Sequence, residues 1–343
     1  MDQKPPSKAL TVRDENAALS RPGGPLPTKI EDAGRPAHIA WDDFFVGAVA
    51  NRNTRLAYER AVRYFLLWAD EHVPDKSLPE LTAGDVGRYL QTLSGGLQKK
   101  KQHLAGLRKF FNLLVERHVI ILNPAAVAQT ERLQVTEGAT PIITDKQVRK
   151  LLSVIKTETV VGLRDRAIFG ILLYTAARAG AVGRLDVDHY SYQGDQWILS
   201  FREKRNKVRK IPVSHDLQGW IDEYVVRAGV LDAPPWTDPE TGTKRRPLFP
   251  TAVRKEKRLT NIPMTSHNIC RMMKRRLREA GLPPDLSPHS FRVTTITDLL
   301  DQQLPLEDVQ DLAGHADPRT TRLYDRSRRQ ITLNIVERIR VGR

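Results

Sequence analysis

The segment of residues 287–324 constrains the fold of this chain more than any other part of its sequence. Ser287 suits the N-cap of a helix, and Pro288 suits the first helical position, which does not need a backbone N–H. His289 and Arg292 follow three residues apart, so they share one face of the predicted helix. These two side chains can therefore converge on one small target.

Two shorter helices are predicted in the rest of this segment. The first fits residues 306–313 and ends at Gly314, a residue typical of helix C-termini. His315 follows directly, at the end of this helix. The second helix begins at Asp317, which suits an N-cap, and carries Tyr324. We expect the three helices to bring the two histidines, the arginine and the tyrosine together.

This set of side chains suits the attack of a tyrosine hydroxyl on a phosphodiester. An arginine binds two phosphate oxygens in a fork and keeps its charge. A histidine moves a proton near neutral pH, and a tyrosine can hold the phosphodiester as a covalent intermediate. Each of these residues alone is more often structural, and only their combination indicates catalysis.

The motifs H-S-F-R, L-A-G-H and T-T-R-L-Y occur in the order found in the tyrosine recombinases, also called the phage integrase family. Over roughly residues 40–340 the chain resembles this family, whose signature is H-x-x-R, L-G-H and a nucleophilic tyrosine. The resemblance implies a mainly α fold with a small antiparallel β-sheet in an α+β catalytic domain. It assigns Arg292 and His315 to the phosphate, His289 to the proton of the nucleophile, and the nucleophile itself to Tyr324.

A further arginine follows a predicted buried helix. The segment T-A-A-R-A-G-A aligns Arg178 with the arginine of the family motif T-G-L-R-I-x-E, which implies a second guanidinium on the phosphate. A buried carboxylate that pairs with Arg178 is the structural alternative. The family motif has an acid three residues later, where this chain has Ala181. Either Asp186, Asp188 or a water supplies that support, or the site is looser than in the family.

A β-hairpin is predicted over residues 197–213, because two runs of β-branched and aromatic residues flank a polar turn. Family members carry a lysine on such a hairpin, and this lysine protonates the leaving 5′ oxygen of the DNA. The spacing back from Pro212 favours Lys204 for this role over Lys207 and Lys210. For the other lysines, phosphate contact without chemistry is the alternative.

A chain of 343 residues has room for two domains. Residues 1–38 are rich in proline and glycine and predict a flexible leader. Residues 39–131 predict a small helical domain, which the resemblance identifies as a core-binding domain that contacts DNA, and residues 132–141 predict a polar linker. Residues 142–343 form the expected catalytic domain. The four helices of the core-binding domain are expected over residues 42–50, 55–72, 82–93 and 98–117.

Two regions of the expected catalytic domain complete this organisation. The proline-rich residues 232–263 predict an extended, partly mobile loop region, followed by a basic helix over residues 265–280. After Tyr324, apolar residues at helical spacing predict a C-terminal helix. This helix packs on its own domain or, as the resemblance suggests, on a neighbouring subunit.

The 55 lysines and arginines outnumber the 40 acidic residues and leave a formal net charge of +15, which favours a polyanionic partner. We expect nucleic acid rather than a membrane, because no apolar run approaches the ~20 residues of a spanning helix. A solvated charged face is the alternative for any single lysine. The expected DNA contacts are Arg52, Arg55, Lys99, Lys100, Lys101, Lys207, Lys274 and Arg275.

Cys270 is the one cysteine, which rules out an internal disulfide and a multi-cysteine metal site. It fits a reducing compartment, and no signal peptide is recognised, so we expect a cytoplasmic protein that associates with the nucleoid. We expect no cofactor, ATP or metal, because the arginines supply the charge. The sequence also has no clustered carboxylates suited to two-metal phosphoryl transfer.

The resemblance implies site-specific DNA recombination, by strand cleavage and rejoining through a 3′-phosphotyrosyl intermediate. The expected partner is double-stranded DNA with inverted-repeat sites, held by a homotetramer on two duplexes. A type IB topoisomerase, which relaxes DNA with similar residues, is the alternative within the enzymes. A catalytically weak DNA-binding protein of the same fold is the alternative outside them, and Ala181 is the feature that supports it.

Overall fold

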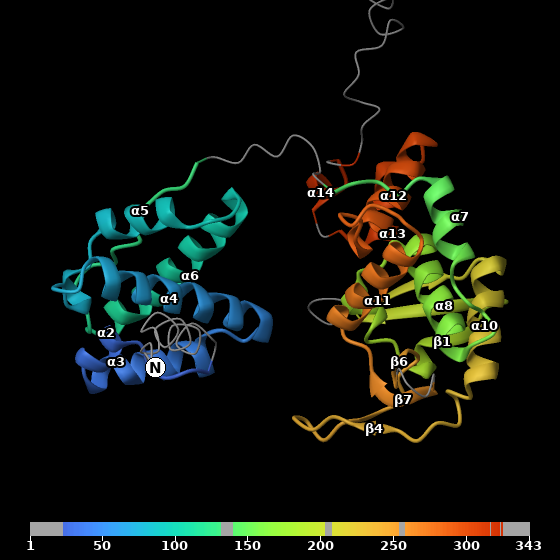
Figure 1. The fold of residues 1–343 in the computed structure, drawn as a ribbon, viewed down its shortest axis with the longest axis horizontal. Coiled ribbons are helices and arrows are strands. Elements are labelled where there is room, and N and C mark those ends of the chain that lie inside the picture. The colour runs from blue at the N-terminus through green and yellow to red at the C-terminus, as the bar shows by residue number, and fades with distance from the viewer. Residues whose placement is uncertain are drawn as a thin grey trace, which may run out of the picture. The chain divides into compact units, whose positions relative to one another are not determined.

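The computed structural model of the chain describes residues 23–131, 140–202, 208–253, 258–315, 317–322 and 324. The chain forms two compact units, Met1–Gln134 and Val135–Arg343. Figure 1 shows the described part of both units as mainly helical, with short strands in the second. The predicted fold class, mainly α with small antiparallel sheets, is confirmed. The predicted linker falls largely outside the described residues, as does the predicted C-terminal helix.

The first unit is a set of helices around an aromatic core. Rings of Trp41, Phe44, Phe45 and Phe110 pack against one another, with Phe45 stacked on Phe110 and the other pairs tilted or edge-on. The described helices are α2 (Thr28–Asp32), α3 (Arg35–Asp42), a π-helical turn (Asp43–Ala48), α4 (Arg52–His72), a 3-10 turn (Leu78–Glu80), α5 (Ala83–Thr92) and α6 (Leu97–Glu116).

Helices α4 and α6 pack closely because α6 carries a glycine at the contact. A Cβ on Gly106 would lie 3.1 Å from the ring of Tyr58 and 3.3 Å from its Cα. Helix α4 begins three residues before the predicted start, since the Asn51 side chain accepts a hydrogen bond from the Thr54 N–H at 3.1 Å and caps the helix. Thr82 caps α5 in the same way, through the N–H of Asp85.

The predicted flexible leader is wrong for residues 28–38, which contain α2 and the first half of α3. The proline and glycine content of this segment favours disorder when it is read alone. In the structure, Arg63 of α4 is only 1% exposed and donates to the carbonyls of Gly24 and Pro25, at 2.9 and 2.5 Å. The carboxylate of Glu59 accepts from the N–H of Gly23 at 2.8 Å. This clasp fixes residues 23–25 on α4.

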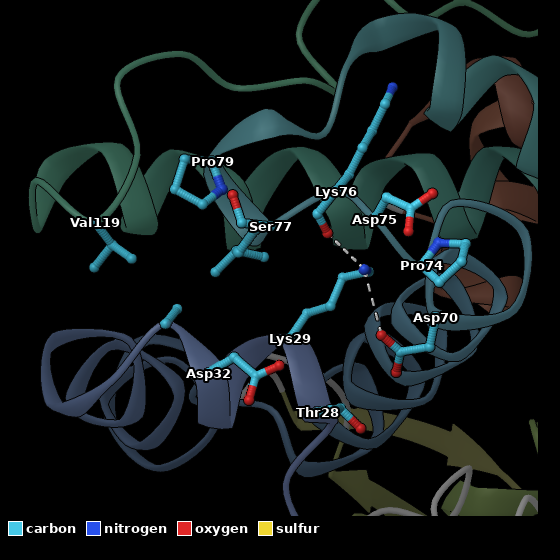
Figure 2. Close-up of a pocket in the computed structure, with 12 residues that line it drawn as sticks. Thr28, Lys29, Asp32, Asp70, Pro74, Asp75, Lys76, Ser77, Pro79 and Val119 are labelled. Carbon is cyan, nitrogen blue, oxygen red and sulfur yellow. Dashed lines mark hydrogen bonds and ion pairs between the residues drawn. The ribbon is translucent and has the colours of Figure 1, made fainter.

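A buried lysine attaches α2 to the end of α4 (Figure 2). The amine of Lys29 donates to the carbonyls of Lys76, at 2.7 Å, and Val73, at 3.2 Å, and lies 3.6 Å from the Asp70 carboxylate. Burial raises the pKa of Asp70, and the charge of Lys29 opposes this shift. These residues line a hollow of about 600 Å³. The buried cation of this hollow is the Lys29 amine, which is already bonded to carbonyls of the protein.

The second unit packs helices around small antiparallel sheets. The described helices are α7 (Asp145–Ser153), α8 (Val160–Tyr174), α9 (Ala179–Val182), a 3-10 turn (Val187–His189), α10 (His215–Ala228), α11 (Ser266–Glu279), α12 (Pro288–Asp301), α13 (Leu306–Ala313) and α14 (Pro318–Arg322). The strands are β1 (Tyr190–Gln193), β2 (Gln196–Arg202), β3 (Val208–Pro212), β4 (Trp236–Thr237), β5 (Lys244–Arg245), β6 (Pro250–Val253) and β7 (Arg258–Pro263).

Strands β2 and β3 confirm the predicted hairpin, and β1 extends it to three strands. Leu199 pairs with Ile211 and Phe201 with Arg209, so these side chains share the inward face. The loop region predicted over residues 232–263 is wrong, because that segment holds the pairs β4–β5 and β6–β7. Its prolines are compatible with strands since Pro250 and Pro263 lie at the strand ends.

One buried carboxylate joins α8 to α11. Asp165 is fully buried and accepts hydrogen bonds from Arg164, at 2.7 and 3.2 Å, Arg275, at 3.0 Å, and Arg276, at 2.7 and 3.0 Å. Burying a charged group is unfavourable unless the charge is paired. Here three guanidiniums pair with the Asp165 carboxylate. The described helices include none that is long and apolar enough to span a bilayer.

Candidate active site

The side chains predicted from the C-terminal motifs meet at the start of α12 and the end of α13. The Tyr324 hydroxyl lies 3.4 Å from Nε2 of His289. The Tyr324 ring lies nearly parallel to that of His315, with centroids 5.9 Å apart and planes at 12°. Arg292 and Arg178 exert their charge on all three of these groups. The structure thus brings together the five predicted site residues that it describes.

Arg292 is the buried base of the site, with 1% of its surface exposed. It lies one turn into α12, which begins where the Ser287 N–H donates to the Ser290 hydroxyl at 3.1 Å. Its guanidinium donates to the carbonyl of Ala176 at 2.5 Å and to that of Ala313 at 2.6 Å. A guanidinium carries five N–H donors in a planar fork, so one arginine can bond several acceptors at once.

Arg178 follows a strained turn at the end of α8. Ala176 has a φ of +48°, in the left-handed region that favours glycine. The family motif T-G-L-R has its glycine at this position, so the strain belongs to this chain's own T-A-A-R sequence. Arg178 is the N-cap residue of α9, and it is exposed. It is the more accessible of the two arginines.

His315 is held by one bond to its backbone carbonyl and one to its ring. Helix α13 ends at Gly314 with a φ of +64°, as predicted, and the Gln310 side chain donates to the His315 carbonyl at 3.1 Å. Nδ1 of His315 lies 2.8 Å from the Thr321 hydroxyl. Burial lowers the pKa of His315 to about 3, and the charges of Arg292 and Arg178 add to the shift.

The protonation states that follow suit a base next to the tyrosine. Burial also lowers the pKa of His289, with the same two arginines contributing, so both histidines are neutral near pH 7. Burial raises the pKa of Tyr324, although the two positive charges lower it in part. The phenol therefore keeps its proton until a base removes it, and His289 is the base within reach.

The acid missing at Ala181 is not replaced by a free carboxylate of Asp186. Ala181 is buried, and its N–H donates to the Arg178 carbonyl at 2.8 Å. Asp186 instead accepts from Arg245, through Nε and an NH₂ group at 2.9 to 3.1 Å. Asp188 is exposed. Asp188, a bound water and a looser site stay open as the alternatives predicted from the sequence.

The two hairpin lysines, Lys204 and Lys207, lie outside the described residues. The strands that flank them are described, and β3 begins at Val208. Lys210 lies on β3 and donates to the Gln193 side chain at 3.0 Å. The assignment of the general acid to Lys204 stays a prediction.

The predicted DNA contacts of the first unit lie at helix starts. Arg52 and Arg55 are in the first turn of α4, and Lys99, Lys100 and Lys101 are in the first two turns of α6. Lys99 is exposed and donates to the Ser94 carbonyl at 2.8 Å. Both helices therefore carry positive charge near their N-terminal ends, where the helix dipole also favours an anion.

The two predicted contacts on α11 have partners within the second unit. The amine of Lys274 donates to the carbonyls of Pro284 and Leu286, the latter at 2.7 Å. Arg275 donates to Asp165. The basic face of the predicted helix therefore fixes α11 in the fold, a role that the local sequence does not reveal because the partners are distant.

Arg209 is a site neighbour that the sequence analysis missed. It lies on β3, is 7% exposed, and exerts its charge on His315. Alternation along the strand could have revealed it, because Arg209, Ile211 and Val213 follow at every second position. Residues at this spacing lie on one face of a strand, and here that face is buried. Among the described residues, no cluster of histidine, cysteine or acidic side chains could hold a metal ion.

The chain is similar in sequence to proteins of one family. The family model described as "Phage integrase family" matches residues 141–330. Tyrosine recombinase XerD of Pseudomonas putida is 28% identical over 277 residues, which cover 79% of this chain and 86% of that protein. Tyrosine recombinase XerC of Syntrophus aciditrophicus is 24% identical over 282 residues, covering 79% of this chain and 86% of the relative.

Solved structures share the fold. XerH site-specific recombinase, bound to its difH substrate before cleavage, has a TM-score of 0.63 and 16% identity, with 92% of this chain and 97% of that chain covered. The Tn1549 transposon integrase, in complex with a circular intermediate DNA, has a TM-score of 0.64 and 18% identity, with 91% and 98% covered. At these identities the likeness concerns the fold.

Proposed function

Because the chain belongs to the phage integrase family, we propose that it is a tyrosine recombinase that cuts and rejoins DNA at specific sites. The matched residues 141–330 include all six side chains of the proposed mechanism. The observation that carries the proposal is the approach of the Tyr324 hydroxyl to Nε2 of His289, at 3.4 Å, beside the buried guanidinium of Arg292. This distance suits proton transfer once bound DNA tightens the site.

The first chemical step is a transesterification on a DNA phosphate. The Tyr324 oxygen bonds to phosphorus while the bond from phosphorus to the 5′ oxygen breaks. The phenol proton goes to Nε2 of His289, and the leaving 5′ oxygen takes a proton from Lys204. The products are a 3′-phosphotyrosyl link and a free 5′ hydroxyl.

Positive charge and hydrogen bonds stabilise the crowded transition state. Arg178 and Arg292 bind the non-bridging oxygens. In the tautomer that we propose for His315, the Thr321 hydroxyl donates to Nδ1, so Nε2 carries the hydrogen. His315 can then donate that hydrogen to a phosphate oxygen while remaining neutral, as its low pKa requires.

The second step reverses the first with a different strand. A 5′ hydroxyl from the partner duplex attacks the phosphotyrosyl link and releases Tyr324. The phosphotyrosine conserves the energy of the phosphodiester, so the exchange proceeds without ATP.

The proposed partner is double-stranded DNA with inverted-repeat arms, held by four copies of the chain on two duplexes. The net charge of +15 and the basic first turns of α4 and α6 favour a polyanion. Among proteins of similar fold, XerH is bound to its difH substrate and the Tn1549 integrase to a circular intermediate DNA. Each neutralised phosphate should contribute about −0.9 to the slope of log affinity against log salt.

The test is covalent capture of DNA. Sites are first selected by binding from a random duplex library, and a nicked suicide substrate is built on the best one. Wild type should form an adduct that survives denaturation, and Tyr324→Phe should bind equally but form none. Tyr192→Phe, which changes an exposed tyrosine on β1, is the matched control and should form the adduct at the wild-type rate.

Two results would contradict the proposal. An adduct that persists in Tyr324→Phe would assign the nucleophile to another residue. A wild type that binds its selected site yet never forms an adduct would leave only the DNA-binding alternative. Strand exchange between two duplexes, rather than relaxation of one supercoiled circle, separates a recombinase from a topoisomerase.

A further inference from the structure

A second buried arginine lies beneath the site, in addition to Arg292. The Arg209 side chain extends from the inward face of β3 and lies over the ring of Phe201, with the guanidinium carbon 5.1 Å from the ring centroid. One of its NH₂ groups donates to the carbonyls of Thr175, at 3.3 Å, and Leu312. Arg209 thereby joins three segments that are far apart in the sequence.

The two carbonyls belong to the turns that carry proposed phosphate ligands. Thr175 lies three residues before Arg178, and Leu312 lies three residues before His315. Arg292 donates to the next carbonyl in each turn, those of Ala176 and Ala313. Two adjacent carbonyls in each turn are therefore held by two arginines that come from different elements, α12 and β3.

The two arginines differ in what they can reach. Arg292 belongs to the H-x-x-R motif and is proposed to bind the phosphate directly. Arg209 comes from β3, and the two bonds described above for it end on backbone carbonyls. An apolar residue at this inward position would stabilise the sheet without the cost of burying a charge. The arginine therefore needs an explanation beyond packing.

We propose that Arg209 is a positioning residue of the recombination reaction, which fixes the Arg178 turn and the His315 turn to strand β3. The proposal rests on the proposed function above. Strand β3 begins four residues after Lys204, the proposed general acid, so Arg209 also ties the strand that follows this lysine to the phosphate ligands. Its positive charge faces His315 and helps to keep that ring neutral.

The distinguishing expectation is a loss of rate without a loss of binding. Misplacing a catalytic group by about 1 Å can lower the rate by about 100-fold, while contacts to the rest of the DNA are unaffected. We therefore expect Arg209→Met to form the covalent adduct about 100-fold more slowly in single turnover at saturating protein, and Arg209→Lys about tenfold more slowly. The affinity for the selected DNA should stay within about twofold of wild type in both variants.

The variants are chosen to separate position from charge and packing. Methionine keeps an apolar stem over Phe201, and lysine keeps the buried cation but replaces the planar fork by one ammonium. Arg227→Met is the matched control. Arg227 also donates to two backbone carbonyls, those of Thr157 and Glu158, but it lies on α10 away from the site. It should cleave at the wild-type rate.

Each outcome decides the proposal. Wild-type cleavage by Arg209→Met or Arg209→Lys would overturn it, as would a rate loss matched by an equal loss of DNA affinity. If Arg209→Met unfolds below the assay temperature, Arg209→Lys alone decides. If both unfold, Arg209 serves folding rather than positioning, and the proposal fails.

A measurement without catalysis keeps this inference separate from the recombinase function. In histidine-labelled protein without DNA, NMR titration should show the midpoint of the His315 ring rising in Arg209→Met, because a nearby positive charge is lost. Arg227→Met should leave it unchanged. If the His315 midpoint shifts but the wild type forms no adduct, the Arg209 contact is supported and the recombinase function is refuted. If the wild type forms the adduct but the midpoint does not shift, only the proposed Arg209 contact is refuted.

Discussion

The ring of Tyr324 lies nearly parallel to that of His315, with 5.9 Å between their centroids. His315 is in turn fixed by the Thr321 hydroxyl, in the helix that leads to the tyrosine. The histidine proposed to bind the phosphate therefore also positions the proposed nucleophile. Burial of both rings makes this pair sensitive to acid, because a buried imidazolium is disfavoured.

His315 should make the protein less stable in acid. Its folded pKa, about 3, is below the ordinary value of 6.5, so the unfolded state binds the proton first and stability is lost as pH falls through 6.5. Between pH 7.5 and pH 5 this histidine should account for about 2 kcal/mol of lost unfolding free energy. In urea titrations, His315→Gln should reduce the difference between the unfolding free energies at pH 7.5 and pH 5 by that amount. His267→Gln, on an exposed residue of α11, should leave it as in wild type.

Arg292→Lys should impair both folding and cleavage. Lysine keeps the charge but cannot donate to the Ala176 and Ala313 carbonyls as a fork, and a buried unpaired carbonyl costs about 1–3 kcal/mol. Loss of the remaining phosphate contact should slow adduct formation by at least about 100-fold. Thermal unfolding and suicide-substrate cleavage measure the two effects. A variant that is destabilised yet cleaves normally would remove Arg292 from the phosphate.

Ala176→Gly should stabilise the protein. An alanine in the left-handed region destabilises the folded state by roughly 1–2 kcal/mol, and glycine relieves this strain. The greater entropy of glycine in the unfolded state offsets about 0.4–1 kcal/mol of this gain. The net gain should be about 0.5–1 kcal/mol, seen as a higher melting temperature of the catalytic unit. Ala177→Gly changes the next residue, whose φ is not positive, and should destabilise. Equal effects of the two changes would mean that the turn is not strained.

Asp165→Asn should be the most damaging change away from the site. It would leave three guanidiniums around a neutral amide, and breaking a buried ion pair costs about 3–5 kcal/mol. Glu223→Gln is the control, because Glu223 is half-exposed beside Arg166 and Arg227 and its pairs are worth at most about 1 kcal/mol. Denaturant unfolding compares the two. A loss of under about 1 kcal/mol for Asp165→Asn would contradict the role assigned to this carboxylate.

Local patterns in the sequence predicted the parts of the site that depend on local geometry. The spacing of His289 and Arg292 gave their common helix face, and Gly314 marked the end of α13. Alternation predicted β2 and β3. These features are set within a few residues, where helix and strand periods apply directly.

Features that depend on distant partners were missed. Arg209 joins positions 34 and 103 residues away, and Asp165 binds arginines 110 and 111 residues along the chain. The strands within residues 232–263 were hidden by prolines that lie at strand ends, and α2 and α3 by a composition typical of disorder. The composition of a segment indicates its structural preference in isolation, whereas these segments are stabilised by contacts with distant parts of the chain.

The clasp at Arg63 has a practical consequence for shortening the protein. A fragment that starts at residue 28 would strip the guanidinium of both carbonyl acceptors, leaving it against Glu59 and the ring of Trp41 in an apolar interior. Fragments of the first unit intended for DNA-binding studies should therefore retain Gly23, even though composition alone places the start of the domain at residue 39.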